Sequence, residues 1–191
     1  MGDPKKNRKK HDRPLHPWRK ERIDAEKSLV KQYGLKNKRE VWQMAAVLRS
    51  IRDQAKNLIA ARGVQAERER GLLLSRLARL GLVSASAKLD DVLGLTLNNI
   101  LDRRLQTVVV RKGLAKTMNQ SRQFIVHTHI VVKDKTITRP SYLVPNTEEP
   151  LIVFSQASKL ASVDHPVRAP PAGKSSAKVE VVKEEPKVKS A

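Results

Sequence analysis

The chain has no cysteine, few aromatic residues and no long apolar run. The absence of cysteine excludes a disulfide scaffold, a thiolate nucleophile and any cysteine-ligated zinc or iron–sulfur site. No apolar run approaches the ~20 residues that a membrane-spanning helix requires, and none follows the basic N-terminus as in a secretory signal. Aromatic residues make up only 3% of the sequence, which is poor material for a platform that stacks single-stranded bases. We therefore expect a cytoplasmic protein with no membrane partner.

Acidic residues are also scarce, because 19 Asp+Glu stand against 39 Lys+Arg and give a formal charge of +20. Such an excess repels itself and indicates an anionic partner, which is nucleic acid, a membrane surface or an acidic protein. Arginine, whose planar fork holds phosphate bidentately, is concentrated in the middle of the chain, whereas lysine dominates both ends. If the partner is RNA, we expect recognition of its folded shape and backbone more than of splayed bases.

Composition and hydrophobic periodicity divide the chain into four segments. Residues 1–22, rich in lysine, arginine and proline, predict a basic extended arm. Residues 23–97 show helical periodicity and predict a helical subdomain. Residues 98–163 predict a two-helix and small antiparallel-sheet module, and residues 164–191 have the composition of a disordered tail. The predicted fold class is therefore α+β.

The clearest helical pattern begins after Asn37. Asn37 is a favourable N-cap residue, and Glu40, three positions later, is expected to act as its capping-box partner. The helix that follows should end near Gly63. Shorter helices are expected over 23–33 and 67–80. The apolar stripe of the long helix consists of Val41, Met44, Ala45, Leu48, Ile51, Ala55, Leu58 and Ile59.

The module over 98–163 begins with two expected helices. Thr96 is the candidate cap of the first, although the β-branched run over 108–110 also suits a strand. Thr117 and Gln120 form a capping box for the second. Two helices joined by a tight glycine-containing connection resemble a helix–turn–helix pair. The strands that should follow are expected over 129–132, 136–138, 141–144 and 151–154.

Cationic side chains cluster in this module, where nine basic residues stand against two acids between positions 101 and 139. Arg103 and Arg104 are expected to point away from the apolar stripe of their helix. Lys116 lies beside the start of the second helix, where backbone N–H groups suit a phosphate. A solvated helix face is the ordinary alternative, but the acids that would interleave such a face are nearly absent. The candidate RNA contacts suggested by charge are Arg103, Arg104, Arg111, Lys112, Lys116 and Arg122 here, and Lys38, Arg39, Arg49 and Arg52 on the long helix.

No catalytic constellation is visible. His127 and His129 would share one face of a strand, but no third metal ligand is at hand, so hydrogen bonding to RNA or to the fold is the better interpretation. The adjacent Asp90 and Asp91 diverge on a helix, so capping suits them better than paired acid–base work. No glycine-rich nucleotide loop is present. We expect no enzyme activity, cofactor, metal or small-molecule substrate.

Several short strings resemble the RNA-binding domain of ribosomal protein S-four. These strings are LDRRLQT at 101–107, GLA at 113–115, SRQ at 121–123, HTHIVV at 127–132 and PSY at 140–142. Upstream, YGLKNKREVW at 33–42 and LGL at 93–95 resemble the archaeal and eukaryotic branch of that ribosomal family. The bacterial branch often carries an N-terminal cysteine zinc site, which a chain without cysteine cannot have. The resemblance covers about residues 19–154.

The resemblance implies a structural protein of the small ribosomal subunit. It implies direct binding of small-subunit ribosomal RNA, nucleation of assembly of the subunit body, and ribosomal protein S-five as a neighbour with a shared part in translational accuracy. No homo-oligomer is expected. For Arg111, Lys112 and Lys116, charge alone supports a contact with RNA. The motif positions that the resemblance assigns to RNA contact are Arg103, Arg104, Arg122, Gln123, His127 and His129.

Two other functions stay open at this point. The first is an RNA-modifying enzyme, such as a pseudouridine synthase, or an RNA chaperone that uses the same module. Such an enzyme adds a catalytic domain with an essential aspartate, and the helical segment here is shorter than a typical catalytic domain. The second is a binder of a membrane surface or of an acidic protein. The long helix argues against the membrane surface, because its apolar face is rich in alanine and lacks the bulk that inserts into lipid.

Overall fold

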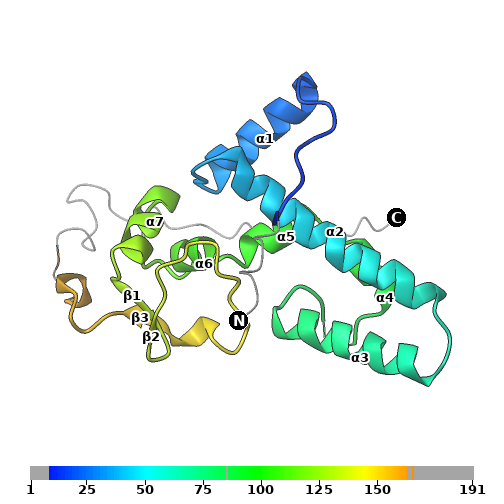
Figure 1. Cartoon of the computed structure of the whole chain (residues 1–191). Coiled ribbons are helices and arrows are strands. Elements are labelled where there is room, and N and C mark those ends of the chain that lie inside the picture. Colours follow the sequence, from blue (N-terminus) through cyan, green and yellow to red (C-terminus); the bar gives the residue numbers. More distant parts are fainter. Residues whose placement is uncertain (1–8, 85, 163–164, 166–191) are drawn as a thin grey trace, which may run out of the picture.

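The computed structural model describes residues 9–84, 86–162 and 165. Seven α-helices and a three-stranded antiparallel sheet are formed within these residues, so the predicted α+β class is confirmed. In Figure 1, α1 to α4 occupy one half of the molecule, α6, α7 and the sheet occupy the other, and α5 lies between them. Part of the predicted arm, residues 1–8, and all of the predicted tail except residue 165 lie outside the described residues.

The first three helices are α1 over Lys20–Gln32, α2 over Lys38–Ala60 and α3 over Val64–Arg79. The predicted N-cap is confirmed, because the side-chain oxygen of Asn37 accepts a hydrogen bond of 3.3 Å from the backbone N–H of Glu40. The apolar stripe of α2 is buried with two exceptions, since Ala45 is half-buried and Ile59 is exposed. The buried residues of α2 are Val41, Met44, Leu48, Ile51, Ala55 and Leu58.

Three short helices follow, α4 over Leu89–Leu93, α5 over Leu97–Asp102 and α6 over Leu105–Arg111. The ambiguous run over 108–110 is therefore helical, and its side chains at 108 and 109 are fully buried. Thr96 precedes α5 but makes no capping hydrogen bond to its backbone. The first helix expected in this module, with Thr96 as its candidate cap, is wrong as a single helix, because α5 and α6 are separate.

The break between α5 and α6 falls at Arg103 and Arg104. The backbone of Arg104 is extended (φ −70°, ψ 143°). A segment from further along the chain takes up the backbone groups at the break, because the N–H of Val144 donates to the carbonyl of Arg103 over 2.9 Å and the N–H of Leu105 donates to Tyr142 over 2.7 Å. Tertiary hydrogen bonding therefore overrides the helical periodicity at this point.

The second half is completed by α7 over Met118–Val126 and by strands β1, Ile130–Val132, β2, Lys135–Thr136, and β3, Ile152–Phe154. The strand order is β2-β1-β3. Thr117 caps α7 by accepting from the N–H of Gln120 over 3.2 Å, as predicted. The strand expected over 141–144 is wrong, since it forms only an isolated bridge between Leu143 and Arg104. Short 3₁₀ turns lie at Glu149–Leu151 and Lys159–Ala161.

The apolar side chains form two clusters that divide at the same break. The first is built on α1 to α5 and includes the fully buried Ala55, Val92 and Leu101. The second is built on α6, α7 and the sheet and includes the fully buried Leu105 and Ile125. None of the described helices combines the length and the apolar character that crossing a membrane requires. The two halves are joined by polar contacts around the break and by Leu143, which packs against the first cluster.

Candidate RNA-binding surface

Five of the predicted RNA contacts lie on the outside of the α6–α7 pair. Arg111 ends α6, Lys112 caps it, and Lys116 lies in the connection to α7. Gln123 and His127 are exposed positions of α7 and its C-cap. Arg111 is half exposed, and its nearest carboxylate, that of Asp102, is 3.9 Å away, which is a weak pairing at this exposure. The outer side of the α6–α7 pair therefore presents positive charge that is wholly or partly exposed to solvent.

Arg103 and Arg104 do not point outward, so this part of the prediction is wrong. Their relative exposure is 8% and 1%. Arg103 donates to Glu149 over 2.7 Å and to the carbonyl of Val144 over 2.8 Å. Arg104 donates to Glu40 over 2.5 Å. The cause is the helix break, because the extended backbone of Arg104 turns both side chains into the junction between the two halves.

Glu40 is the centre of an ionic cluster with Arg104 and Arg122. Its carboxylate accepts from Arg122 over 2.9 Å as well as from Arg104. Burial alone would raise the pKa of Glu40, but the hydrogen bonds and charges of the two guanidinium groups outweigh it and lower that pKa. The expected capping-box role of the Glu40 side chain is therefore wrong. Arg122 is only partly exposed, and one carboxylate between two guanidinium groups leaves the cluster with a net positive charge.

Hydrogen bonds around this cluster attach the α1–α2 turn to the end of α5 and to the α6–α7 pair. The hydroxyl of Tyr33 donates to Asp102 over 3.0 Å, and its burial together with this bond raises the pKa of Tyr33 to about 12. The side chain of Gln106 donates to the carbonyls of Gly34 and Met118 over 3.0 and 2.9 Å. These bonds connect elements that lie far apart in the sequence and fix the α6–α7 pair relative to α2.

The two histidines lie near one another but not on one strand. His127 is the C-cap of α7, and Thr128 has a positive φ of 63°, so β1 begins only after His129. The expectation of alternate positions on a strand is therefore wrong. The ring centroids are 6.4 Å apart, and Nδ1 of His129 is hydrogen-bonded to the hydroxyl of Ser158 over 2.9 Å. Across the described residues, no three His, Cys, Asp or Glu side chains form a group that could hold a metal ion.

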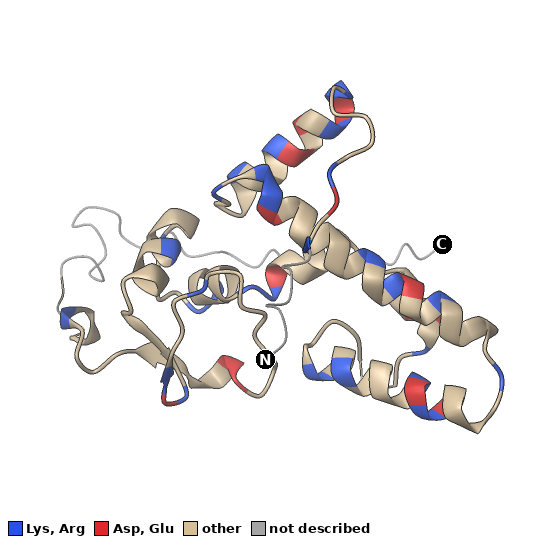
Figure 2. Ribbon diagram, in the orientation of Figure 1, with Lys and Arg blue, Asp and Glu red and all other residues tan. Residues whose placement is uncertain are grey.

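The predicted cations of α2 form a separate group. Lys38 pairs with Glu26 at 3.5 Å, and Arg52 donates to the carbonyl of Leu95 over 2.5 Å, so both also hold the fold together. Arg39 and Arg49 are exposed. Figure 2 shows lysine and arginine on α1, α2 and α3 as well as on the α6–α7 half, with fewer acidic residues among them.

The ionic roles of Glu26 and Glu40 were not predicted from the sequence. Glu26 is 6% exposed and accepts from Arg22 over 2.5 Å, although it lies on a helix with no marked apolar face. The spacing of Arg22 and Glu26, four positions apart, was the available signal. The ionic role of Glu40 was missed for another reason. Its position three residues after Asn37 already fitted a capping box, so no ion pair was considered.

The fold and the surface together define a class, an α+β nucleic-acid-binding module attached to a helical unit. Two family models match the chain, "Ribosomal protein S4/S9 N-terminal domain" over residues 3–102 and "S4 domain" over residues 103–149. The boundary between them falls at the break between α5 and α6.

Curated relatives match nearly the whole length of the chain. The small ribosomal subunit protein uS4 of Methanococcus aeolicus is 52% identical over 169 residues, which cover 88% of this chain and 96% of the relative. Its counterparts from Thermoplasma acidophilum and Nanoarchaeum equitans are 48% and 50% identical, over 88% and 85% of this chain and 86% and 92% of the relatives. The chain belongs to the family of small ribosomal subunit protein uS4.

Proposed function

We propose that this chain is a structural constituent of the small ribosomal subunit that binds ribosomal RNA through the outer side of the α6–α7 pair. The contact residues are Arg111, Lys112, Lys116, Gln123 and His127. Arg103 and Arg104, being buried and paired, hold the surface in place instead of contacting RNA. Arg122 lies at the edge of the surface and divides its charge between Glu40 and the RNA.

The observation that carries this proposal is the unequal distribution of acids. The acids near the break are bonded within the fold, Glu40 and Glu149 to arginines and Asp102 to Tyr33. The cations at the end of α6 and in the connection to α7 remain wholly or partly exposed to solvent. Such a surface suits phosphates held in a fixed arrangement, as in folded RNA, and requires no bond to be made or broken.

The test measures binding of the full chain to folded small-subunit ribosomal RNA over a range of salt concentrations. In the variant Arg111→Ala with Lys112→Ala, the slope of log K against log salt should become less steep by about 1.8, that is ~0.9 for each phosphate that the variant no longer neutralises. Circular dichroism should remain unchanged, because both side chains lie outside the hydrophobic clusters.

The matched control is Arg68→Ala with Arg76→Ala, which removes the same charge from exposed positions of α3. If both double variants lost the same affinity, binding would follow net charge and the α6–α7 surface would be the wrong site. A parent chain whose affinity hardly depended on salt would contradict RNA binding through phosphates altogether.

Family membership supports a wider role. We infer that the chain acts on the ribosome in the cytoplasm, binds early and helps nucleate assembly of the subunit body. Ribosomal protein S-five is the expected neighbour, with a shared part in translational accuracy. A reconstitution that omits this chain should stop before the body is formed, and one that completes the body without it would contradict this role.

A further inference from the structure

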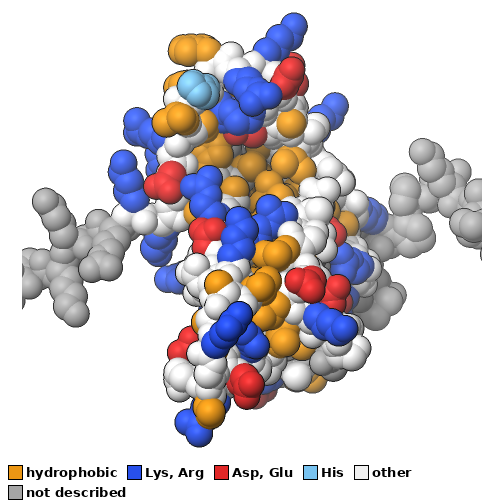
Figure 3. Space-filling view, turned by 90° about the vertical axis from the view of Figure 1, so that its right-hand side faces the viewer, with side chains coloured by type: hydrophobic (Ala, Val, Ile, Leu, Met, Phe, Trp, Pro, Cys, Tyr) orange, Lys and Arg blue, Asp and Glu red, His pale blue; other side chains and the backbone are white. Residues whose placement is uncertain are grey.

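A cleft of about 650 Å³ lies between the N-terminal arm and helices α1 and α2. Both tryptophans of the chain, Trp18 and Trp42, line it. Its size is within the range of ~300–1,000 Å³ that is usual for small-molecule sites. Figure 3 shows the face of the molecule that lies to the right in Figure 1, where hydrophobic side chains gather with lysine and arginine around them.

Glu26 fixes the walls of this cleft. Its buried carboxylate accepts from Arg22 over 2.5 Å and from the indole N–H of Trp42 over 2.9 Å, and it pairs with Lys38 at 3.5 Å. Arg22 also donates to the carbonyl of Pro17 over 2.9 Å and so attaches the arm to α1. The cleft is therefore held open by polar bonds that exist without any ligand, which reduces the entropy lost on binding.

Two features of the cleft favour a flat ligand that can stack on aromatic rings. Trp18 is 91% exposed, which is costly for a large indole unless a partner covers it. The ring of His11 lies 6.1 Å from that of Trp42, and its buried Nδ1 has no hydrogen-bond partner among the described residues. Aromatic faces that line one cleft suit a nucleobase, which can stack on them.

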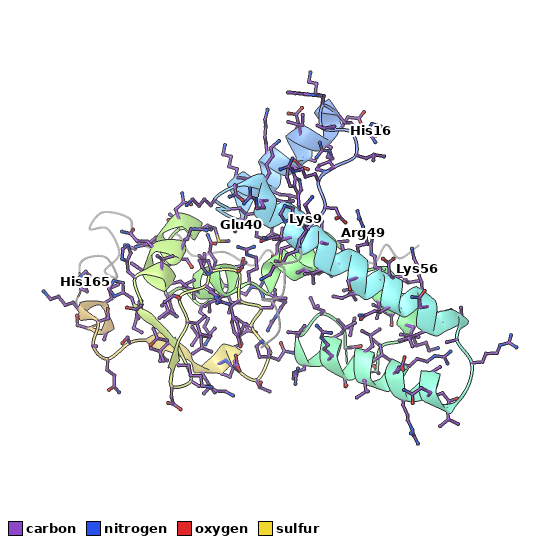
Figure 4. All side chains as sticks on the ribbon, in the orientation of Figure 1. Lys9, His16, Glu40, Arg49, Lys56 and His165 are labelled. Carbon is purple, nitrogen blue, oxygen red and sulfur yellow. The ribbon has the colours of Figure 1, made fainter. Side chains whose placement is uncertain are left out.

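The charge around the cleft also favours a nucleotide. Glu26 is the one acid among its lining residues, whereas Lys9, Arg13 and Arg39 line it without an ion pair in the described part of the chain. Figure 4 shows Lys9 beside α2 and His16 further along the arm. Cations around aromatic faces form the arrangement that single-stranded nucleic acid prefers, whereas an apolar peptide would leave these charges unmatched.

We propose that this cleft binds one unpaired nucleotide of the RNA, with its base stacked on the indoles of Trp18 and Trp42. Its phosphates contact Lys9, Arg13 and Arg39. The proposal rests on the RNA binding proposed above and adds a second site on the other half of the molecule. It also modifies the expectation from composition, because scarce aromatic residues are sufficient for one stacked base when both tryptophans line the same cleft.

The two tryptophans make the cleft directly observable, since all tryptophan fluorescence of the full chain comes from its walls. The probes are the 5′-monophosphates of adenosine, guanosine, cytidine and uridine, with ribose 5-phosphate as the control that lacks a base. A nucleotide should quench the emission with saturation, and ribose 5-phosphate should not. In Trp18→Ala, monitored through Trp42, nucleotide affinity should fall roughly 5- to 150-fold, the range of base–aromatic stacking.

The matched control is Leu15→Ala, which removes an equally exposed apolar side chain, 90% exposed, that does not line the cleft. It should leave nucleotide affinity unchanged. Equal quenching by ribose 5-phosphate would show that the cleft binds the phosphate and not the base. Unchanged nucleotide affinity in Trp18→Ala would exclude stacking of the base on Trp18. Protection of the arm from protease by another ribosomal protein but not by RNA would assign the cleft to a protein partner. Each of these results overturns the proposal.

The two proposals fail separately. The variant Arg111→Ala with Lys112→Ala, which tests the α6–α7 surface, should keep full nucleotide quenching. If this variant and the parent bind RNA as expected but nucleotides do not bind the cleft, only the further inference is wrong. If nucleotides bind the cleft but folded ribosomal RNA does not bind the chain, the proposed function is wrong.

Discussion

Removing the carboxylate of Glu40 should destabilise the whole chain. In Glu40→Gln the side chain keeps its size, but Arg104, with 1% exposure, loses the one ionic partner that it has among the described residues. Two further nitrogens of Arg104 already lack hydrogen-bond partners within the described structure, so the neutral amide would leave a buried charge almost unsolvated. Breaking a buried ion pair from one side costs about 3–5 kcal/mol, a large part of the ~5–15 kcal/mol that stabilises a typical domain.

The assay is urea unfolding followed by circular dichroism, with Glu67→Gln on the exposed side of α3 as the control. The control should stay within about 0.5 kcal/mol of the parent. Adding Arg104→Met to Glu40→Gln should recover much of the loss, because the unpaired charge is then gone. A Glu40→Gln variant as stable as the parent would refute the structural role assigned to this cluster, whose place at the start of α2 is shown in Figure 4.

The same cluster predicts an acid dependence with a definite sign. The pKa of Glu40 is lower in the folded chain than its ordinary value of 4.5. Its contribution to stability is therefore complete above about pH 4.5 and is lost as the pH falls through the lowered pKa. Between pH 5 and pH 3 the parent should lose more stability than Glu40→Gln does, and parallel curves would contradict the assignment.

Two further predictions concern the α1–α2 turn. The pKa of Tyr33 is raised from 10.0 to about 12 by burial and by its hydrogen bond to Asp102, so its contribution to stability is complete below pH 10 and is lost as the pH rises toward 12. Tyr33→Phe should therefore show a weaker alkaline loss of stability than the parent, measured by circular dichroism, and an equal loss would contradict this. Gly34→Ala should cost about 1–3 kcal/mol in urea unfolding, because φ is +56° and the added Cβ would lie 2.6 Å from that of Met118. Gly71→Ala, inside a helix with open space around it, should instead stabilise by about 0.5–1 kcal/mol, and similar effects at both glycines would refute the close-contact argument.

Local signals in the sequence were sufficient for the elements whose ends are set by nearby residues. The caps at Asn37 and Thr117 and the buried stripe of α2 follow from spacing and side-chain chemistry within a few residues. The break at Arg103 does not, because it depends on backbone bonds to residues about forty positions later. The segment over 141–144 was predicted as a strand for a related reason. Its local pattern does not reveal that its backbone bonds to the break between α5 and α6 instead of to a neighbouring strand.

The candidate site was predicted in part. Charge counting located the cationic segment, but it treated all cations as equivalent and had no means to separate those that are paired inside from those that face outward. For Arg104 the deciding fact is Glu40, which lies 64 positions earlier in the sequence. A double variant Arg103→Glu with Arg104→Glu would now be expected to unfold the chain and could not report on RNA binding alone.

The bonds at the junction also determine what can happen while the chain is being synthesised. The carboxylate of Glu40 and its partner Arg122 are 82 positions apart, and the Tyr33–Asp102 bond spans 69. Domains form as the polypeptide emerges, beginning at the N-terminus. The contacts between the first helices and the following module can therefore form only after that module has left the ribosome, and the carboxylate of Glu40 stays hydrated until then. For a chain whose destination is itself a ribosomal subunit, nascent-chain length then sets the earliest moment at which the two halves acquire a fixed relative position.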